Sequence, residues 1–432
     1  MVGVSAPAAA FAVRGHGTWT SRDFYRPLSR LHLGAIGTVL ATLVLADAFF
    51  GGWWGDPVSF TANPLPLVFW VDFWVGVGII SGLVANVWDF ISPVNWAGRA
   101  LDRALARRDF AVRAYPDWLG AWPSVVLLLV FSWMELVWEK GDRPHDLLVV
   151  LAVYIVGQLG GMALFGAETW IARAELFTVL ARTFSRFAPV EYFVRTEEGD
   201  VIGDPDAWIA ADREDRGVRL RPYGAGIRRE PPLLPGGGAF VVATLATVVF
   251  DGYHSSKTYA TLIDRIFPGE QAGSESVGTL AMIVIVGGFL LAFIAVSALV
   301  SVFEEGSVLR TAERYAPTLI PIAAVYFSAH YFLYWGYLGQ LTPGTLADPL
   351  ERDWVPDYGP WQPLSGATVW WIQVVLIVFG HIVAVVEAHR VSLTVQRRSP
   401  DALVAQIPFV ILMVAYTFSG LWVLGQSLRE VS

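Results

Sequence analysis

Nine long apolar stretches follow one another along the chain, separated by shorter polar segments. A helix needs about 20 mostly apolar residues to cross the hydrocarbon core of a bilayer, and each stretch comes within a few residues of that length. The pattern therefore predicts an all-α integral membrane protein with about nine transmembrane helices. The expected spans are 31–50, 66–88, 121–138, 147–166, 237–254, 279–302, 317–338, 368–389 and 406–426.

Arginine residues gather in alternate segments and so give the expected helices a direction. They concentrate in 1–30, in 99–113, in 173–229, and in the loops after the sixth and eighth spans. Short cytoplasmic loops hold the excess of Lys and Arg in membrane proteins. We therefore expect a protein of the cell membrane with its N-terminus in the cytoplasm and its C-terminus outside. The first apolar run, Ala6–Val13, is short and has no basic residue before it, so 1–30 is expected to be a cytoplasmic tail.

The spans divide into a group of four over 31–166 and a group of five over 237–432. Between them, 167–189 mixes arginine with large apolar residues, a pattern that predicts an amphipathic helix at the membrane surface. Segment 190–236 is the one sizeable polar insertion, and we expect it in the cytoplasm. Its run Val190–Arg195 and the turn-rich Glu197–Asp200 indicate a small β-hairpin.

Composition limits the chemistry that the protein can carry. The chain is 55% hydrophobic with a mean hydropathy of +0.51, which is typical of a chain whose main partner is a lipid bilayer. It has no cysteine, so thiolate metal sites and disulfides are excluded and His and carboxylates must supply any metal ligands. The net charge of −8 gives no reason to expect a nucleic-acid partner.

Ionisable residues inside the spans are the candidates for function, because charged groups within lipid are costly and usually face protein. In the expected topology most of them fall at a similar depth in the outer half of the membrane. His330 and His381 are the deepest histidines. An outward-facing pocket is expected from Asp72, Glu135, Asp251, His254, His330 and His381, with Asp47 nearby in depth.

The residue types in this pocket suit a divalent transition metal such as Zn, Fe, Mn or Cu. Asp251 and His254 are three residues apart and share one face of a helix. We expect Asp251, His254, His330 and His381 to be the metal ligands. A metal-bound water is a nucleophile at neutral pH, and Glu135 is the expected general base, with Asp72 as a further catalytic carboxylate.

Other interpretations stay open. Taken singly, Asp47, Asp72 and Asp251 are better explained by capping or solvent contact at a helix end. An interhelical hydrogen bond accounts for Glu135 as well as a ligand role does. The same residues suit a transporter of a metal or small solute. His330 and His381 lie on neighbouring spans, as a pair of haem b ligands in an electron carrier would.

Several short sequence segments resemble those of a known family, among them Asn86–Pro93, Tyr115–Pro123, Phe250–Gly252, Ala329–Phe332 and Leu412–Thr417. Together they resemble membrane proteins of bacteria and archaea known as fenitrothion hydrolase-like. The resemblance covers most of the chain and is weakest in 190–236. It implies metal-assisted hydrolysis of a phosphotriester, and it assigns no catalytic residue.

Overall fold

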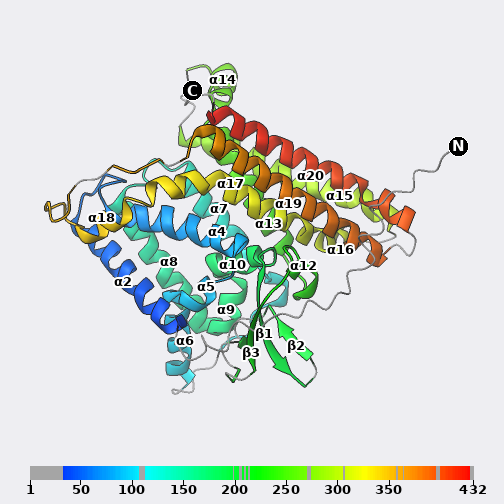
Figure 1. The fold of residues 1–432 in the computed structure, drawn as a ribbon, viewed down its shortest axis with the longest axis horizontal. Coiled ribbons are helices and arrows are strands. Elements are labelled where there is room, and N and C mark those ends of the chain that lie inside the picture. The colour runs from blue at the N-terminus through cyan, green and yellow to red at the C-terminus, as the bar shows by residue number, and fades with distance from the viewer. Residues whose placement is uncertain are drawn as a thin grey trace.

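The computed structural model describes residues 33–428 except 107–111, 198, 204–206, 209–210, 213–214, 270–273, 305–306, 357–358, 363 and 396–398. Long helices make up most of the described chain (Figure 1). The first group is α2 (Leu33–Trp54), a continuous rod of α3 (Pro64–Pro66), η2 (Leu67–Val75) and α4 (Gly76–Leu83), then α7 (Trp122–Leu136) and α8 (Pro144–Phe165). The second group is α13 (Gly237–His254), α15 (Glu275–Phe303), η4 (Ala316–Leu319) with α17 (Ile320–Leu338), α19 (Gly366–Val395) and α20 (Ser399–Leu428).

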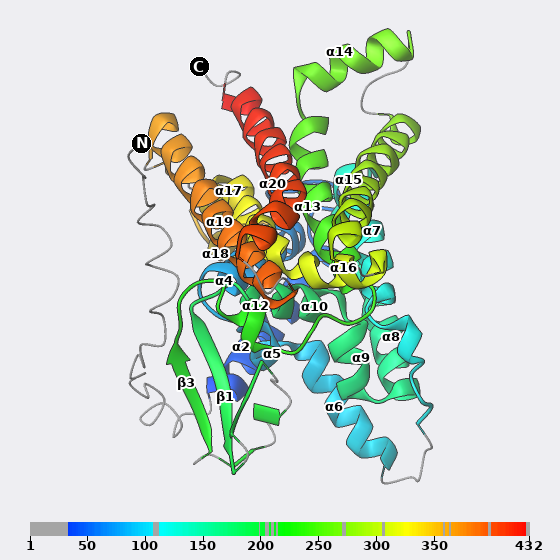
Figure 2. The ribbon, with the colours of Figure 1, turned by 90° about the vertical axis from the view of Figure 1, so that its right-hand side faces the viewer.

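Shorter elements connect these helices. They are α5 (Trp88–Ile91), α6 (Pro93–Ala106), η3 (Asp117–Leu119), α9 (Ala167–Arg173), α10 (Leu176–Ser185), α12 (Gly226–Arg229), α14 (Lys257–Ile266), α16 (Val308–Tyr315) and α18 (Thr342–Ala347), with the strands β1 (Val190–Thr196), β2 (Gly199–Ile202) and β3 (Arg216–Leu220). The strands and α14 lie at opposite ends of the long helices (Figure 2).

Seven helices of the described residues are long and apolar enough to cross a membrane. They correspond to seven of the nine expected spans and confirm a multi-pass membrane protein of helical class. The other two expected spans are also helices. The polar end of α13, Asp251–His254, lowers its mean hydropathy, and the described apolar part of α20 is Gln406–Trp422.

Helix α13 occupies the centre of the bundle. It packs against α7, α15, α17 and α20, and every side chain from Phe240 to Phe250 is buried. The apolar pattern of this segment has no polar face, which is typical of a helix surrounded by protein. The hydroxyls of Thr244 and Thr247 donate hydrogen bonds within this helix, to the backbone carbonyls of Phe240 and Thr244 respectively. The polar residues Asp251–His254 at its end are half-buried and lie beside the helices that surround α13.

Glycines let the neighbouring helices approach closely. A Cβ at Gly380 on α19 would lie 2.3 Å from Val325 Cγ2 and 2.8 Å from the carbonyl oxygen of Pro321. A Cβ at Gly78 on α4 would lie 2.4 Å from Phe327 Cε1. Because real Cβ atoms do not approach other atoms so closely, α17 is fixed between α4 and α19 by these two glycines.

The segment expected as one surface helix over 167–189 differs in the structure. It forms two helices, α9 and α10, and the break comes at Ala174–Glu175, where the Glu175 side chain accepts hydrogen bonds from the backbone N–H groups of Phe177 and Thr178. This capping starts a new helix inside the segment. All of α10 is buried except Arg182, which makes a two-pronged ion pair with the buried Asp89. The arginine that suggested a membrane surface thus contacts protein.

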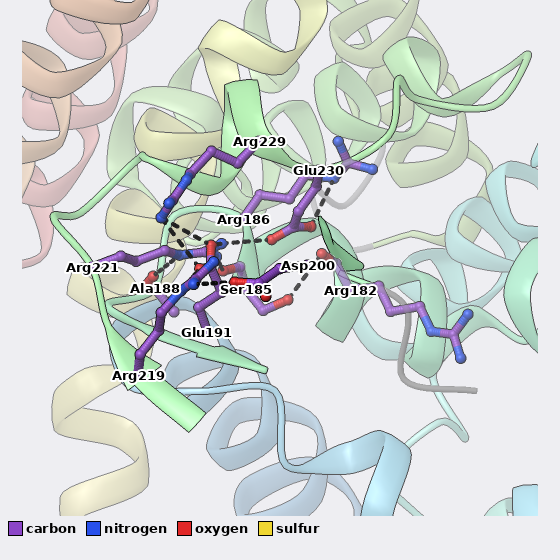
Figure 3. A network of polar contacts seen from close by, with 10 residues as sticks. All are labelled: Arg182, Ser185, Arg186, Ala188, Glu191, Asp200, Arg219, Arg221, Arg229 and Glu230. Atoms are coloured by element: carbon purple, nitrogen blue, oxygen red, sulfur yellow. Dashed lines mark hydrogen bonds and ion pairs between the residues drawn. The ribbon is translucent and has the colours of Figure 1, made fainter. Parts of the chain in front are cut away.

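The hairpin expected in the polar insertion is present. Strands β1 and β2 pair antiparallel with Thr196 opposite Gly199, and β3 adds a third strand on the other side of β1. Ion pairs join this sheet to α12 and to the end of α10, and Figure 3 shows the network. We call this group the sheet cluster; it comprises Glu191, Asp200, Glu230, Arg186, Arg219, Arg221 and Arg229.

Candidate functional site

The pair formed by Asp251 and His330 is the centre of the candidate site. Asp251 stands in the last turn of α13 and His330 on the neighbouring α17, and His330 Nε2 lies 2.8 Å from Asp251 Oδ2. The side chains are 19% and 15% exposed. The other ring nitrogen, Nδ1 of His330, is buried and makes no hydrogen bond to any described residue. The pair therefore links two helices, with the second ring nitrogen of His330 enclosed between them.

Glu135 adds a third ionisable group to the pair. It stands in the last turn of α7 and lies close enough to Asp251 for the two charges to interact. The buried indole of Trp74 faces Glu135, although its Nε1 does not meet the geometry of a hydrogen bond. Glu135 as a whole residue is half-buried where these helices meet.

Two tyrosines of α17 complete the site. The hydroxyl of Tyr331, next to His330 in sequence, approaches the carboxylate of Asp251. Tyr334 follows one helical turn after His330, is 37% exposed, and lies within electrostatic range of both Glu135 and Asp251. The site thus combines two carboxylates, one imidazole and two phenols on three packed helices.

His254 lies at the edge of this group. It follows Asp251 by three residues on α13, within electrostatic range of that carboxylate, but the hydrogen bond of Asp251 goes to His330. The imidazole of His254 instead packs on aromatic rings, with centroid distances of 5.2 Å to Phe250 and 4.9 Å to Tyr259. The shared helical face predicted for Asp251 and His254 is present without a direct contact between them.

Asp72 and His381 have other partners. Asp72 Oδ1 accepts a hydrogen bond of 3.2 Å from the indole of Trp335, and Asp72 is one of the residues that line a largely apolar cavity beside α2. His381 Nδ1 lies 3.0 Å from Thr417 Oγ1, a contact between α19 and α20. Within the part of the chain that the structure describes, neither forms a hydrogen bond or ion pair with Asp251 or His330.

These positions do not assemble the expected metal ligands. Among the described residues, no three His, Asp or Glu side chains form a group that could hold a metal ion. His330 Nε2 is engaged by Asp251, and His381 by Thr417, so the imidazoles do not converge on one point. The residues as arranged here do not fit the metal, and we derive no chemical step through it.

Sequence reasoning did not single out Tyr331 and Trp74. The one signal for Tyr331 was its position next to His330 in the sequence. Trp74 gave none, because it lies in η2, a π-helix whose i→i+5 pattern changes which residues share a face. Comparison of the chain with models of known protein families, with curated proteins and with solved structures found no match.

Proposed function

We propose that this protein is a carrier that couples movement of a small solute to proton exchange at the Asp251–His330 pair. The 2.8 Å contact between these side chains, inside a bundle of membrane-spanning helices, is the observation that carries the proposal. Ionisable residues within membrane helices mark ion pathways and proton relays. Gain or loss of a proton by the imidazole alters the interaction that joins α13 to α17.

The proposal includes the topology of the chain. In this proposal the chain crosses the membrane nine times, because α13 and α20 are added to the seven helices that are long and apolar enough to span it. The N-terminus is then cytoplasmic and the C-terminus external. The arginine-rich sheet then lies inside the cell, in accordance with the excess of positive charge on cytoplasmic segments. In this topology the site formed by Glu135, Asp251 and His330 lies toward the outer face of the membrane.

The charge balance of the site favours a carrier of cations. Glu135 and Asp251 supply two carboxylates against the one imidazole of His330, and Asp142 lies within electrostatic range of Tyr334. With both carboxylates ionised the site keeps a net negative charge even when His330 is protonated. A proton or a small cation therefore competes for the same place, which is the requirement for coupled exchange.

Solute uptake by proteoliposomes tests this proposal. The vesicles would receive Mn²⁺, Zn²⁺, tetramethylammonium or inorganic phosphate under an imposed pH gradient, with solute uptake and internal pH followed together. We expect cation uptake that needs the gradient and dissipates it, falls at least tenfold in His330→Gln and Asp251→Asn, and persists in His145→Gln, whose exposed imidazole lies outside the site. Absence of uptake with every solute, or unchanged uptake in His330→Gln, would count against a carrier.

A membrane hydrolase is the second candidate, and the Asp–His pair itself favours it. A carboxylate that fixes one ring nitrogen of a histidine prepares the imidazole for acid–base catalysis, and Glu135 is then the general base for water. A nitrophenyl phosphotriester distinguishes the two functions. Release of nitrophenol by the wild type, lost in Glu135→Gln and His330→Gln but kept in His145→Gln, would favour hydrolysis over transport.

A further inference from the structure

We infer that Arg228 and Arg390 form a binding site for the headgroup phosphate of an anionic phospholipid, at the end of α19 that contacts α12. Helix α19 is one of the helices long and apolar enough to cross a membrane, and Arg390 stands near its C-terminal end. Arg228 belongs to α12, the short helix that follows the sheet. This site is separate from the Asp251–His330 pair and does not depend on the carrier proposal.

One buried carboxylate holds both arginines. Arg228 Nε donates to Glu387 Oε2 at 2.7 Å, and Arg390 Nη1 donates to Glu387 Oε1 at 2.6 Å. The Glu387 side chain is 1% exposed, whereas those of Arg228 and Arg390 are 46% and 43% exposed. Within the described chain, neither guanidinium has another ion pair. Because a guanidinium carries five N–H donors, most of the donors of this pair are left for a second anion.

The neighbouring Arg229 repeats this arrangement of charge. Its side chain is 44% exposed and pairs with Glu191, which is 1% exposed. On this surface the guanidiniums therefore face outward and the carboxylates lie beneath them. Guanidinium geometry suits the paired oxygens of a phosphate, and basic pockets beside transmembrane helices bind anionic headgroups. The surface is complementary to a phosphate group.

A stripe of exposed apolar side chains on α19 leads to Arg390. Phe379, Ile382, Val386 and Arg390 are spaced i, i+3, i+7 and i+11, so they share one face of the helix. The three apolar side chains are 39%, 56% and 42% exposed. On a helix that crosses a membrane, such a face contacts acyl chains. An acyl chain along this stripe places its headgroup at the level of the arginine.

The loop that precedes α12 is fixed at the same level. The hydroxyl of Tyr223 donates to the carbonyl oxygen of Leu83 at 2.8 Å, and Leu83 ends the apolar helix α4. The Tyr223 ring meets Phe379 edge-on with a centroid distance of 5.3 Å. A Cβ on Gly224, at φ +78°, would lie 2.5 Å from Val383 Cγ1. Since tyrosine is enriched where membrane meets water, this loop marks the level of the headgroups.

An anionic phospholipid matches all of these features together. Its phosphate pairs with the two guanidiniums, its glycerol lies at the level of Tyr223, and its acyl chains cover the apolar stripe. A soluble phosphate ester would use the guanidiniums alone, and a zwitterionic lipid would bring a cation to a surface that is already positive.

Quenching by brominated lipids tests this inference on the full chain in bilayers. The sequence has no cysteine, so Ile382→Cys gives a single attachment point for a fluorophore. Brominated phosphatidylglycerol or brominated phosphatidylcholine is mixed into ordinary phosphatidylcholine, and quenching yields the relative binding constant of the two lipids at the label. We expect a preference of about fivefold for phosphatidylglycerol. The matched control is Val156→Cys on α8, which is 70% exposed and should show a ratio of about one.

Two further variants, made in the Ile382→Cys protein, assign the preference to the arginines. Replacement of Arg228, Arg390 and Glu387 together by Gln removes the cations without leaving a buried charge unpaired, and the ratio should fall to about one. Glu387→Gln alone releases both guanidiniums from their counter-charge, so the ratio should rise. Melting temperatures of both variants check that the fold is kept.

Equal ratios at positions 382 and 156 in the otherwise unchanged protein would overturn the lipid site, as would an unchanged ratio in the triple variant or a lower ratio in Glu387→Gln. Excess glycerol 3-phosphate should leave the lipid preference intact, and loss of the preference would assign the arginines to a soluble phosphate ester instead. His330→Gln should not change the ratio, so failure of the carrier proposal and failure of the lipid site are distinguishable.

Discussion

His330 on α17 and Asp251 on α13 are held 2.8 Å apart, and each is more than four-fifths buried. Removal of one partner has unequal effects on the two sides of this contact. An unpaired imidazole can give up its proton and stay neutral at pH 7, whereas an unpaired carboxylate remains an uncompensated charge. Loss of the contact therefore costs more free energy when Asp251 is the side chain left unpaired than when His330 is.

This asymmetry predicts the stabilities of two variants. Breaking a buried ion pair by deleting one member costs about 3 kcal/mol or more, and we expect His330→Ala to approach that loss. Asp251→Ala should cost less, close to the roughly 0.6 kcal/mol typical of an interhelical hydrogen bond in a membrane protein. Reversible unfolding in mixed micelles at pH 7 measures both values. Equal losses would show that the pair is neutral rather than ionic.

The close approach of α17 and α19 gives a second prediction. Gly380→Ala places a methyl group where only 2.3 Å separates it from Val325, and one of its other close neighbours is backbone, which cannot move aside. Overpacking of this kind costs about 1–3 kcal/mol. Gly287→Ala on α15 is the matched control, since a Cβ there meets nothing within 4 Å. We expect the melting temperature to fall in the first variant and to stay level or rise in the second.

The sheet cluster should depend on one carboxylate. Glu191 is 1% exposed and forms ion pairs with Arg219, Arg221 and Arg229. Arg221 is itself 2% exposed. Glu191→Gln removes the carboxylate that three arginines share and leaves Arg221 with Glu230 alone. The expected cost is therefore at the lower end of the roughly 3–5 kcal/mol typical of breaking a buried ion pair. Hydrogen exchange should then speed up along β1 and β3.

Asp200→Asn is the control for that experiment. Asp200 is 34% exposed and pairs with Arg219 at the edge of the same cluster. Exposed pairs contribute about 0–1 kcal/mol, so exchange along the strands should change little. Similar acceleration in both variants would argue that the sheet depends on its total charge instead of on the buried carboxylate.

Glu230 gives the cluster a pH dependence. Burial, opposed by the nearby Arg221 and Arg186, raises the pKa of Glu230 above its ordinary value of 4.5. From pH 4.5 up to the higher native pKa, the folded protein holds a proton at this carboxyl that the unfolded chain has released. Stability must therefore fall as pH rises through that window. Glu230→Gln should remove this part of the slope when thermal unfolding is followed from pH 4 to pH 7. Parallel curves for the two proteins would contradict the prediction.

The sequence predicted the helices well because an apolar run of span length has few alternatives in a membrane protein. It predicted the depth of ionisable residues but not their direction around each helix. Asp72 and His330 have similar expected depths, yet Asp72 contacts Trp335 and a cavity beside α2, while His330 faces α13. A π-helix in η2 and the break at Glu175 alter the helical register, and neither leaves a clear pattern in the residues. The metal site expected from depth alone consequently separates into several local contacts.

The buried carboxylate of Glu387 ties the sheet to a membrane helix. It stands on α19, 1% exposed, and accepts from Arg228 of α12 at 2.7 Å and from Arg390 on its own helix. Helix α12 follows β3 closely in the chain. A tilt or rotation of α19 would therefore also displace the segment that carries the strands. The ion pair thus ties the position of α19 to that of the polar segment that carries the strands.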